Sequence, residues 1–319
     1  NGFAIFWFGV CATGLLFAQA KRFQVIHIGD MAMWPLGWFA KLCNPRARIV
    51  ISAHGTDVVY ANRPGLRPAL YRTYLRLGAV RLSAAKVIAN SGATRKALAR
   101  HGFFHAAIVP LAARPSGSAP NAKQNHNQHV PEKFLLFSGR LTRQKGCGWF
   151  IQSVLPQLPE EVSLYVAGVV TDASERDALN DPRVRFLGPV DPVELASLRR
   201  NALAVIAPNI KCSQTDFEGF GLSATEGAAD GGVVIAADLF GLKTAVIDQV
   251  TGFLVSPGNP AAWREKICDV NSWSEKERHC FVANAINAVR DHYSWERVTR
   301  QTLDVYGLRV CEDSKRRAA

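Results

Sequence analysis

The stretch DFEGFGLSATEGAADGGVVIAAD (216–238) contains two glutamates and several glycines, followed by the apolar run GVVIAAD (232–238). A second apolar run, ALAVIAP (202–208), precedes it. Short, continuous apolar runs predict buried strands, and the segment that begins near Leu222 predicts a helix between them. We therefore expect a strand, a glycine-rich loop, a helix and another strand, the repeating unit of a parallel sheet covered on both faces.

The same alternation extends along the chain and predicts an α/β fold. Apolar runs that predict strands lie at 23–29, 47–55, 85–91, 106–112, 133–139, 162–168, 184–188, 202–208, 232–238 and 252–257. Helical patterns separate most of these runs. One of them, at 67–84, predicts a helix whose apolar face holds Leu70, Tyr74, Leu77 and Leu82, with Arg72 and Arg76 on another face.

A polar segment rich in proline, glycine and asparagine, RPSGSAPNAKQNHNQHVPE (114–132), divides the two series of strands. We expect an N-terminal domain at 1–113, a linker at 114–131, a C-terminal domain at 132–291 and a closing helix and tail at 292–319. We interpret His126 and His129 of this segment as solvent-exposed side chains rather than metal ligands.

Charge is distributed unevenly over the chain, whose formal net charge is +12. Residues 1–130 hold 16 lysines and arginines against two acidic residues, whereas the remainder is close to neutral. Such a basic half suits an anionic membrane surface, phosphorylated ligands or nucleic acid, or it is simply a solvated basic face. Because no arginine-rich or aromatic RNA-binding signature accompanies it, we expect no nucleic acid and favour the membrane surface.

Seven scattered cysteines without a Cys-x-x-Cys pattern support neither a disulfide framework nor a zinc site, which fits a cytosolic setting. The uncharged stretch at 1–20 borders on the length of a membrane span. It has no preceding basic region, and four polar or small residues dilute it, so we favour a buried helix that leads into the strand at 23–29.

Two further motifs follow predicted strands. In FSGRLTRQKG (137–146), Arg140 and Lys145 come directly after a strand, where a guanidinium and an ammonium can converge on one diphosphate. In SAHGTDVV (52–59), Gly55 turns the chain and presents His54 at the strand end, while Asp57 either caps the next segment or orients the ring. Each of these side chains also has a plainer interpretation as a solvated or structural residue.

Glu218 and Glu226 are better suited to hydroxyl groups than to phosphates, because carboxylate oxygens accept charge-assisted hydrogen bonds. Gly219 and Gly221 permit close approach of the backbone to a ligand, and the following helix start attracts anions. A favourable interaction with the helix dipole would explain Glu226 without a ligand, but not the paired glycines.

Taken together, these motifs resemble the retaining glycosyltransferases of family 4, which have the two-domain GT-B fold. The resemblance runs in order from FQVIHIGD through SAHGTDVV, FSGRLTRQKG and EGFGLSATEGAADGGVVIAAD to YSWERVTRQTLDVY, over about residues 23–306. It implies two Rossmann-like doubly wound domains that face each other across a cleft, with the first strand and glycine-rich loop of the N-terminal domain missing. A mild departure is Val233, where the family commonly has proline.

The resemblance also implies roles for individual residues. Arg140 and Lys145 would hold the diphosphate of a nucleotide-sugar donor, Glu218 and the backbone of Gly219, Phe220 and Gly221 would contact its sugar, and His54 would approach that sugar from the other domain. Glu226 would bind the ribose, the helix start at Leu222 and Ser223 would face the phosphates, and Gly188, Pro189 and Val190 would flank the base. No bound metal or other cofactor is expected.

The function implied is transfer of a hexose to a lipid-linked or glycan acceptor, in cell-surface polysaccharide or glycolipid synthesis. The enzyme would work in the cytoplasm, peripherally at the inner membrane face, with residues 1–113 on the anionic surface. Two alternatives stay open: a fragment that binds nucleotide or membrane without turnover, and a sugar-nucleotide epimerase of the same fold.

Overall fold

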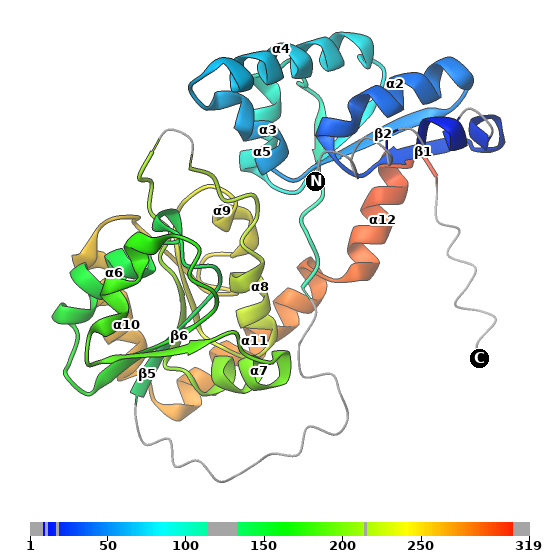
Figure 1. Cartoon of the computed structure of the whole chain (residues 1–319). Coiled ribbons are helices and arrows are strands. Elements are labelled where there is room, and N and C mark those ends of the chain that lie inside the picture. The colour runs from blue at the N-terminus through cyan, green and yellow to red at the C-terminus, as the bar shows by residue number, and fades with distance from the viewer. Residues whose placement is uncertain (1–8, 10–11, 17–18, 114–132, 214–215, 309–319) are drawn as a thin grey trace, which may run out of the picture. The chain divides into compact units, whose positions relative to one another are not determined.

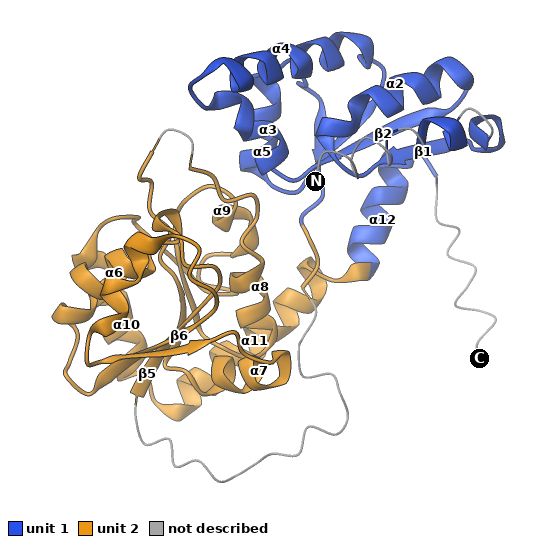
Figure 2. Ribbon diagram, in the orientation of Figure 1, with its two compact units in different colours: residues 1–110, 296–319 blue, residues 111–295 orange. Residues whose placement is uncertain are grey.

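The computed structural model describes residues 9, 12–16, 19–113, 133–213 and 216–308. The chain forms two compact units: unit 1 comprises residues 1–110 and 296–319, and unit 2 comprises residues 111–295 (Figure 2). The predicted linker at 114–131, with His126 and His129, lies outside the described residues.

Unit 2 is built on a six-stranded parallel sheet. Its strands are β5 (Lys133–Ser138), β6 (Val162–Ala167), β7 (Val184–Gly188), β8 (Ala204–Ala207), β9 (Val234–Ala237) and β10 (Phe253–Val255). Their order is β10-β9-β8-β5-β6-β7, and every neighbouring pair is parallel. This is the doubly wound order of a Rossmann-type sheet, in which the chain reverses its direction of travel between the two central strands.

Helices cover both faces of this sheet (Figure 1). They are α6 (Cys147–Ser153), α7 (Pro192–Asn201), α8 (Leu222–Ala229), α9 (Leu242–Ala245), α10 (Pro260–Ser272) and α11 (Glu275–His292). On one face, Phe150 of α6 meets the fully buried Trp263 of α10 edge to face, with ring centroids 5.8 Å apart. Strands β8 and β9 are buried along their whole length, which explains why they are apolar at every position rather than at alternate ones.

Unit 1 contains a four-stranded parallel sheet in the sequential order β1-β2-β3-β4. The strands are β1 (Val25–Ile28), β2 (Arg48–Ala53), β3 (Lys86–Ala89) and β4 (Ala106–Ile108). Its helices include α2 (Trp34–Cys43), α3 (Thr56–Val59), α4 (Leu66–Arg81), α5 (Gly92–Ala99) and nearly all of α12 (Trp295–Tyr306).

Helix α12 is the C-terminal element that completes unit 1. Arg48 Nη1 donates to Tyr306 O over 2.7 Å, His27 Nδ1 lies 2.7 Å from the Tyr306 hydroxyl, and Arg297 Nη2 donates to Pro110 O over 2.6 Å. The segment at 292–319, which sequence patterning sets apart as a closing helix and tail, therefore contributes α12 to the packing of the N-terminal unit.

All ten predicted strands are present, and residues 12–16 of the stretch at 1–20 are helical. The predicted apolar face at 67–84 is right for Leu82, which is buried, and for Tyr74, which is half-buried, but wrong for Leu70 and Leu77, which are exposed. Leu75 and Gly78 of α4 are buried instead. The helix carries apolar residues around much of its circumference, so periodicity could not identify the packed side. Within the described residues, no helix combines the length and the apolar character needed to cross a membrane.

Candidate active site

The loops that follow β5 and β8 meet at the reversal point of the unit 2 sheet. Leu135 to Phe137 of β5 pair with Ala204 to Ile206 of β8, so both strands end at the same edge. Ligands of doubly wound sheets bind at this edge, beyond the carboxyl ends of the strands. Arg140 lies here with its side chain exposed, directly after β5.

Gly146 holds the β5 loop against the end of β8. Its backbone is left-handed, with φ 72°, and a Cβ atom there would lie 2.0 Å from Pro208 O. Two further hydrogen bonds join the loops: Ile210 N donates to Gln144 O over 3.0 Å, and Phe217 N donates to Gln144 Oε1 over 3.3 Å. The position of Lys145, in the turn just before Gly146, is therefore fixed relative to the β8 loop.

Lys145 and Glu218 form an ion pair across the two loops. Asn209, which is buried two positions after the end of β8, donates its Nδ2 to the same Glu218 oxygen over 3.2 Å. The Lys145 and Glu218 side chains are only 19% and 15% exposed, so they are shielded from water and yet accessible to a ligand. The structure thus brings together two predicted residues that stand 73 positions apart in the chain.

The segment Gly219–Gly221 leads from Glu218 into helix α8. Phe220 is buried, and its ring lies edge to face with Tyr293 at 6.0 Å between centroids, so its backbone rather than its side chain is presented at the site. Gly221 is the N-cap of α8 with φ 102°, and it supplies no side-chain cap. The first N–H groups of the helix, at Leu222 and Ser223, therefore lack intrahelical partners, a few residues after Glu218.

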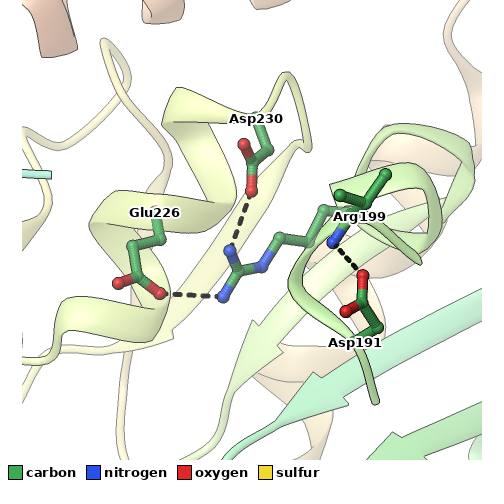
Figure 3. A network of polar contacts seen from close by, with 5 residues as sticks. Asp191, Arg199, Glu226 and Asp230 are labelled. Atoms are coloured by element: carbon green, nitrogen blue, oxygen red, sulfur yellow. Dashed lines mark hydrogen bonds and ion pairs between the residues drawn. The ribbon is translucent and has the colours of Figure 1, made fainter. Parts of the chain in front are cut away.

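Glu226 belongs to a charged network in which a buried arginine holds two carboxylates (Figure 3). Arg199, from α7, donates through Nη2 to Glu226 Oε2 over 3.0 Å and through Nη1 to Asp230 Oδ2 over 2.8 Å. The Arg199 side chain is 2% exposed and Asp230 is buried, whereas the Glu226 side chain is 36% exposed. Asp230 therefore pairs with the arginine in the interior, and Glu226 is held by the same guanidinium at the surface.

The remaining predicted residues of unit 2, Gly188 to Val190, follow β7 at the same edge of the sheet. Gly188 O accepts a hydrogen bond from Gly168 N over 2.8 Å, which ties the end of β7 to the end of β6. Strand β7 lies two strands away from β5, so this segment borders the site rather than forming its centre.

His54 belongs to unit 1, where it follows β2 with an exposed side chain. Its Nε2 lies 2.9 Å from Gly29 O; because a carbonyl oxygen only accepts, Nε2 carries the proton and a neutral ring leaves Nδ1 as an acceptor. Asp57 accepts from the backbone N–H groups of His54 and Gly55, over 3.0 and 2.7 Å, so it shapes the turn. Burial raises the pKa of the Asp57 carboxyl.

Sequence reasoning missed Asn209, Gln144, Arg199 and Asp230. Asn209 had a usable signal, since it directly follows a predicted strand on the ligand-binding edge. Arg199 had none, because its partners lie 27 and 31 positions away. Across the described residues, no cluster of three or more His, Cys, Asp or Glu side chains is arranged to hold a metal ion.

Comparison with known proteins finds one glycosyltransferase family model that matches each half of the chain. Residues 4–111 match the model of Glycosyltransferase Family 4, and residues 132–272 match that of Glycosyl transferases group 1. A D-inositol 3-phosphate glycosyltransferase of Salinispora arenicola is 36% identical, with 94% of this chain and 73% of that relative covered. The chain belongs to the family 4 glycosyltransferases.

Other relatives of this family 4 chain align over shorter regions. An uncharacterized glycosyltransferase of Methanocaldococcus jannaschii is 32% identical over 56% of this chain, and a D-inositol 3-phosphate glycosyltransferase of Xylanimonas cellulosilytica is 33% identical over 60%. In both cases the aligned region spans 45% of the relative's own length.

Solved structures confirm the predicted GT-B fold of this family 4 member. Anabaena HepE in complex with UDP superposes with a TM-score of 0.74 at 19% identity, covering 92% of this chain and 81% of that one. A sucrose-phosphate synthase of Thermosynechococcus elongatus superposes with a TM-score of 0.67 at 23% identity, covering 91% and 75%. At these identities the likeness concerns the fold alone.

Proposed function

We propose that this chain transfers a hexose from a nucleoside-diphosphate sugar to a glycan or lipid-linked acceptor, with retention of the anomeric configuration. The observation that carries the proposal is the meeting of Lys145 and Glu218 beside the open N-terminus of α8, at the reversal point of the sheet. A cation and free backbone N–H groups at this edge match the diphosphate of a sugar nucleotide, and a carboxylate beside them matches the hydroxyls of its sugar.

Each part of the donor has a partner in this arrangement. Arg140, Lys145 and the N–H groups of Leu222 and Ser223 would bind the diphosphate, and Glu218 with the Gly219–Gly221 backbone would bind the hexose. Glu226, oriented by Arg199, would accept the ribose hydroxyls. Gly188, Pro189 and Val190 would lie along the base.

The chemistry proposed is loss of the nucleoside diphosphate from the anomeric carbon through a transition state with oxocarbenium character. Negative charge grows on the leaving diphosphate, so Arg140 and Lys145 stabilise the transition state more than the ground state. The acceptor hydroxyl attacks from the face that the diphosphate leaves, and its proton passes to an oxygen of the departing diphosphate. His54 of unit 1 would approach the donor sugar with its exposed ring.

We assign no covalent nucleophile to this site. The nearby thiol of Cys147 is fully buried, and burial together with the charge of Glu175 raises its pKa, so it stays protonated. Metal independence is part of the proposal: activity should survive a chelator, because the protein's own cations neutralise the diphosphate.

UDP-sugars are the first donors to test, since HepE was solved with UDP and with UDP-glucose. The acceptor side of the proposal rests on the basic residues of 1–130. They favour an enzyme that works peripherally at the cytoplasmic face of a membrane, in cell-surface polysaccharide or glycolipid synthesis.

The test is transfer measured with UDP-sugars and a panel of glycan and lipid acceptors. Lys145→Ala and Glu218→Ala should each lower kcat/KM by about 10²-fold, because each removes a preorganised contact to the reacting groups. Lys133→Ala is the matched control: this lysine is exposed at the opposite end of the same strand, β5, and its loss should leave the rate unchanged.

Three results would contradict the proposal. If Lys145→Ala transferred the sugar at an unchanged rate, the assignment of Lys145 to the donor site would be wrong. Conversion of a donor to its epimer in the absence of acceptor would indicate an epimerase. Donor binding by calorimetry without transfer to any acceptor would indicate a binding protein.

A further inference from the structure

Helix α4 of unit 1 carries a row of apolar side chains that are exposed to solvent. Leu66, Leu70, Leu77 and Val80 are 76%, 62%, 45% and 73% exposed, and Thr73 between them is also exposed. These five positions follow the spacing i, i+4, i+7, i+11 and i+14, which places them along one side of a helix. We call these five residues the outer stripe.

The opposite side of α4 anchors the helix to unit 1 and fixes the direction of the stripe. Leu75 and Gly78 are buried, and a Cβ atom at Gly78 would lie 2.9 Å from the Trp34 ring. The Tyr71 hydroxyl donates to Asp57 O over 2.7 Å. Rotating α4 to bury the outer stripe would break these contacts, so the exposure of the stripe is a property of the packed helix.

Arginines border the outer stripe on both sides. At 100° per residue, Arg67 and Arg81 fall on one flank of the stripe and Arg76 falls on the other, and all three are exposed. The chain from residue 58 to residue 131 contains no aspartate or glutamate. The nearest preceding acid, Asp57, is engaged by backbone N–H groups, including those of His54 and Gly55.

We propose that α4 is a membrane-docking helix, whose outer stripe enters the headgroup boundary of a bilayer that contains anionic phospholipids. Leucines along the middle with arginines along the flanks are the pattern of a helix lying in the plane of a membrane surface. The proposal deepens the acceptor side of the proposed function, and it rests on that function only for the conclusion that the acceptor is lipid-linked.

Other occupants fit this face less well. A second copy of the chain would place the arginines of two stripes against each other without acidic partners, which is unfavourable. A nucleic acid would suit the arginines but would leave four large apolar side chains against a phosphate backbone. An anionic bilayer satisfies both features, because lipid tails accept the leucines while headgroups pair with the arginines.

The experiment is co-sedimentation of the whole chain with vesicles of phosphatidylcholine mixed with phosphatidylglycerol, and with vesicles of phosphatidylcholine alone. We expect binding to the mixed vesicles that weakens as salt is added. Leu70→Ser with Leu77→Ser should lower the partition coefficient at least tenfold, because apolar burial drives insertion. Arg67→Gln with Arg76→Gln should lower it and reduce its dependence on salt.

Two controls separate α4 from the rest of the protein. Val250→Ser and Arg264→Gln remove an exposed apolar and an exposed basic side chain from unit 2, and they should leave vesicle binding unchanged. Lys145→Ala should also bind vesicles like the unmodified chain, so that failure of the transfer reaction and failure of docking are observed separately. Because all the substituted α4 side chains are exposed, circular dichroism should show unchanged folding.

The proposal is overturned if the unmodified chain does not bind the mixed vesicles, or if the leucine variant binds them as well as the unmodified chain. It is equally overturned if the leucine substitutions abolish a dimer of the free protein, because the stripe would then be covered by a second copy.

Discussion

At the scale of single residues, the candidate site depends on buried charges whose partners come from distant parts of the chain. Asn209 and Lys145 both contact Glu218, and Arg199 holds Glu226 and Asp230. A buried guanidinium costs free energy unless carboxylates pair with it, so this network is stable only when it is complete. The ion pair between Arg199 and Glu226 also orients the Glu226 carboxylate at the surface.

Arg199→Met is therefore expected to lower the free energy of unfolding by about 3 kcal/mol, because it removes the guanidinium that forms a buried ion pair with Asp230. The variant should also discriminate less between ribose and 2′-deoxyribose donors, since Glu226 loses its orientation. Urea unfolding and donor KM measure the two effects. Arg200→Met, at the exposed neighbouring position of α7, is the control, and equal stability of the two variants would contradict the role of Arg199.

At the scale of elements, the geometry of the candidate site depends on the close approach of two loops. Gly146 lets the β5 loop touch the β8 loop at Pro208 O, and this contact sets the separation between Lys145 and Glu218. Gly258 offers a comparison, because its φ of 68° nearly equals the 72° of Gly146 but a Cβ atom there would meet nothing within 4 Å.

Gly146→Ala should therefore cost more than Gly258→Ala. Both substitutions place alanine in the left-handed region, at about 1 kcal/mol each. Only the first also forces two backbone segments apart, which adds about 1–3 kcal/mol. Chemical unfolding measures the difference. Donor affinity should fall only in Gly146→Ala, and equal losses of stability would show that the loops are not in tight contact.

At the scale of the whole molecule, the two units are stabilised by different interactions. Unit 2 has a large apolar core around its six strands, which includes Phe134, Phe150 and Trp263. Unit 1 contains two imidazoles with a lowered pKa, of which His101 is buried and His27, on β1, is partly covered by its neighbours. Burial, with a smaller effect of His54, lowers the pKa of His27, and burial together with neighbouring arginines, chiefly Arg76, lowers the pKa of His101.

Acid should therefore destabilise unit 1. A histidine whose folded pKa lies below its ordinary value of 6.5 binds its proton more readily in the unfolded chain. Stability is then greatest above pH 6.5 and decreases as the pH falls below that value. Urea unfolding at a series of pH values checks this. His27→Gln should weaken the dependence of the free energy of unfolding on pH, whereas His279→Gln, at an exposed position of α11, should not.

A pH dependence identical in the unmodified chain and in His27→Gln would rule out this residue as a source of the effect. A decrease of unit 2 stability alone over the same range would contradict the assignment to unit 1.

Local sequence pattern predicted all ten strands, the start of α8 at Leu222 and the two loops that carry Lys145 and Glu218. For β8 and β9 it succeeded because a strand buried on both faces must be apolar throughout. For the two loops it succeeded because a backbone that approaches a ligand closely needs glycine. The prediction for α4 failed at Leu70 and Leu77, because this helix has apolar residues on two sides and only its tertiary neighbours, such as Trp34, determine which side is packed.

Contacts between distant segments could not be predicted from any local sequence pattern. The pairing of β5 with β8, the guanidinium of Arg199 between two carboxylates and the return of α12 to unit 1 each join residues tens to hundreds of positions apart. The alternation of strands and helices follows from which side chains avoid water, a property of each short segment. Strand order and buried charge pairing follow from the free energy of the complete packed unit, so only the tertiary structure could reveal them.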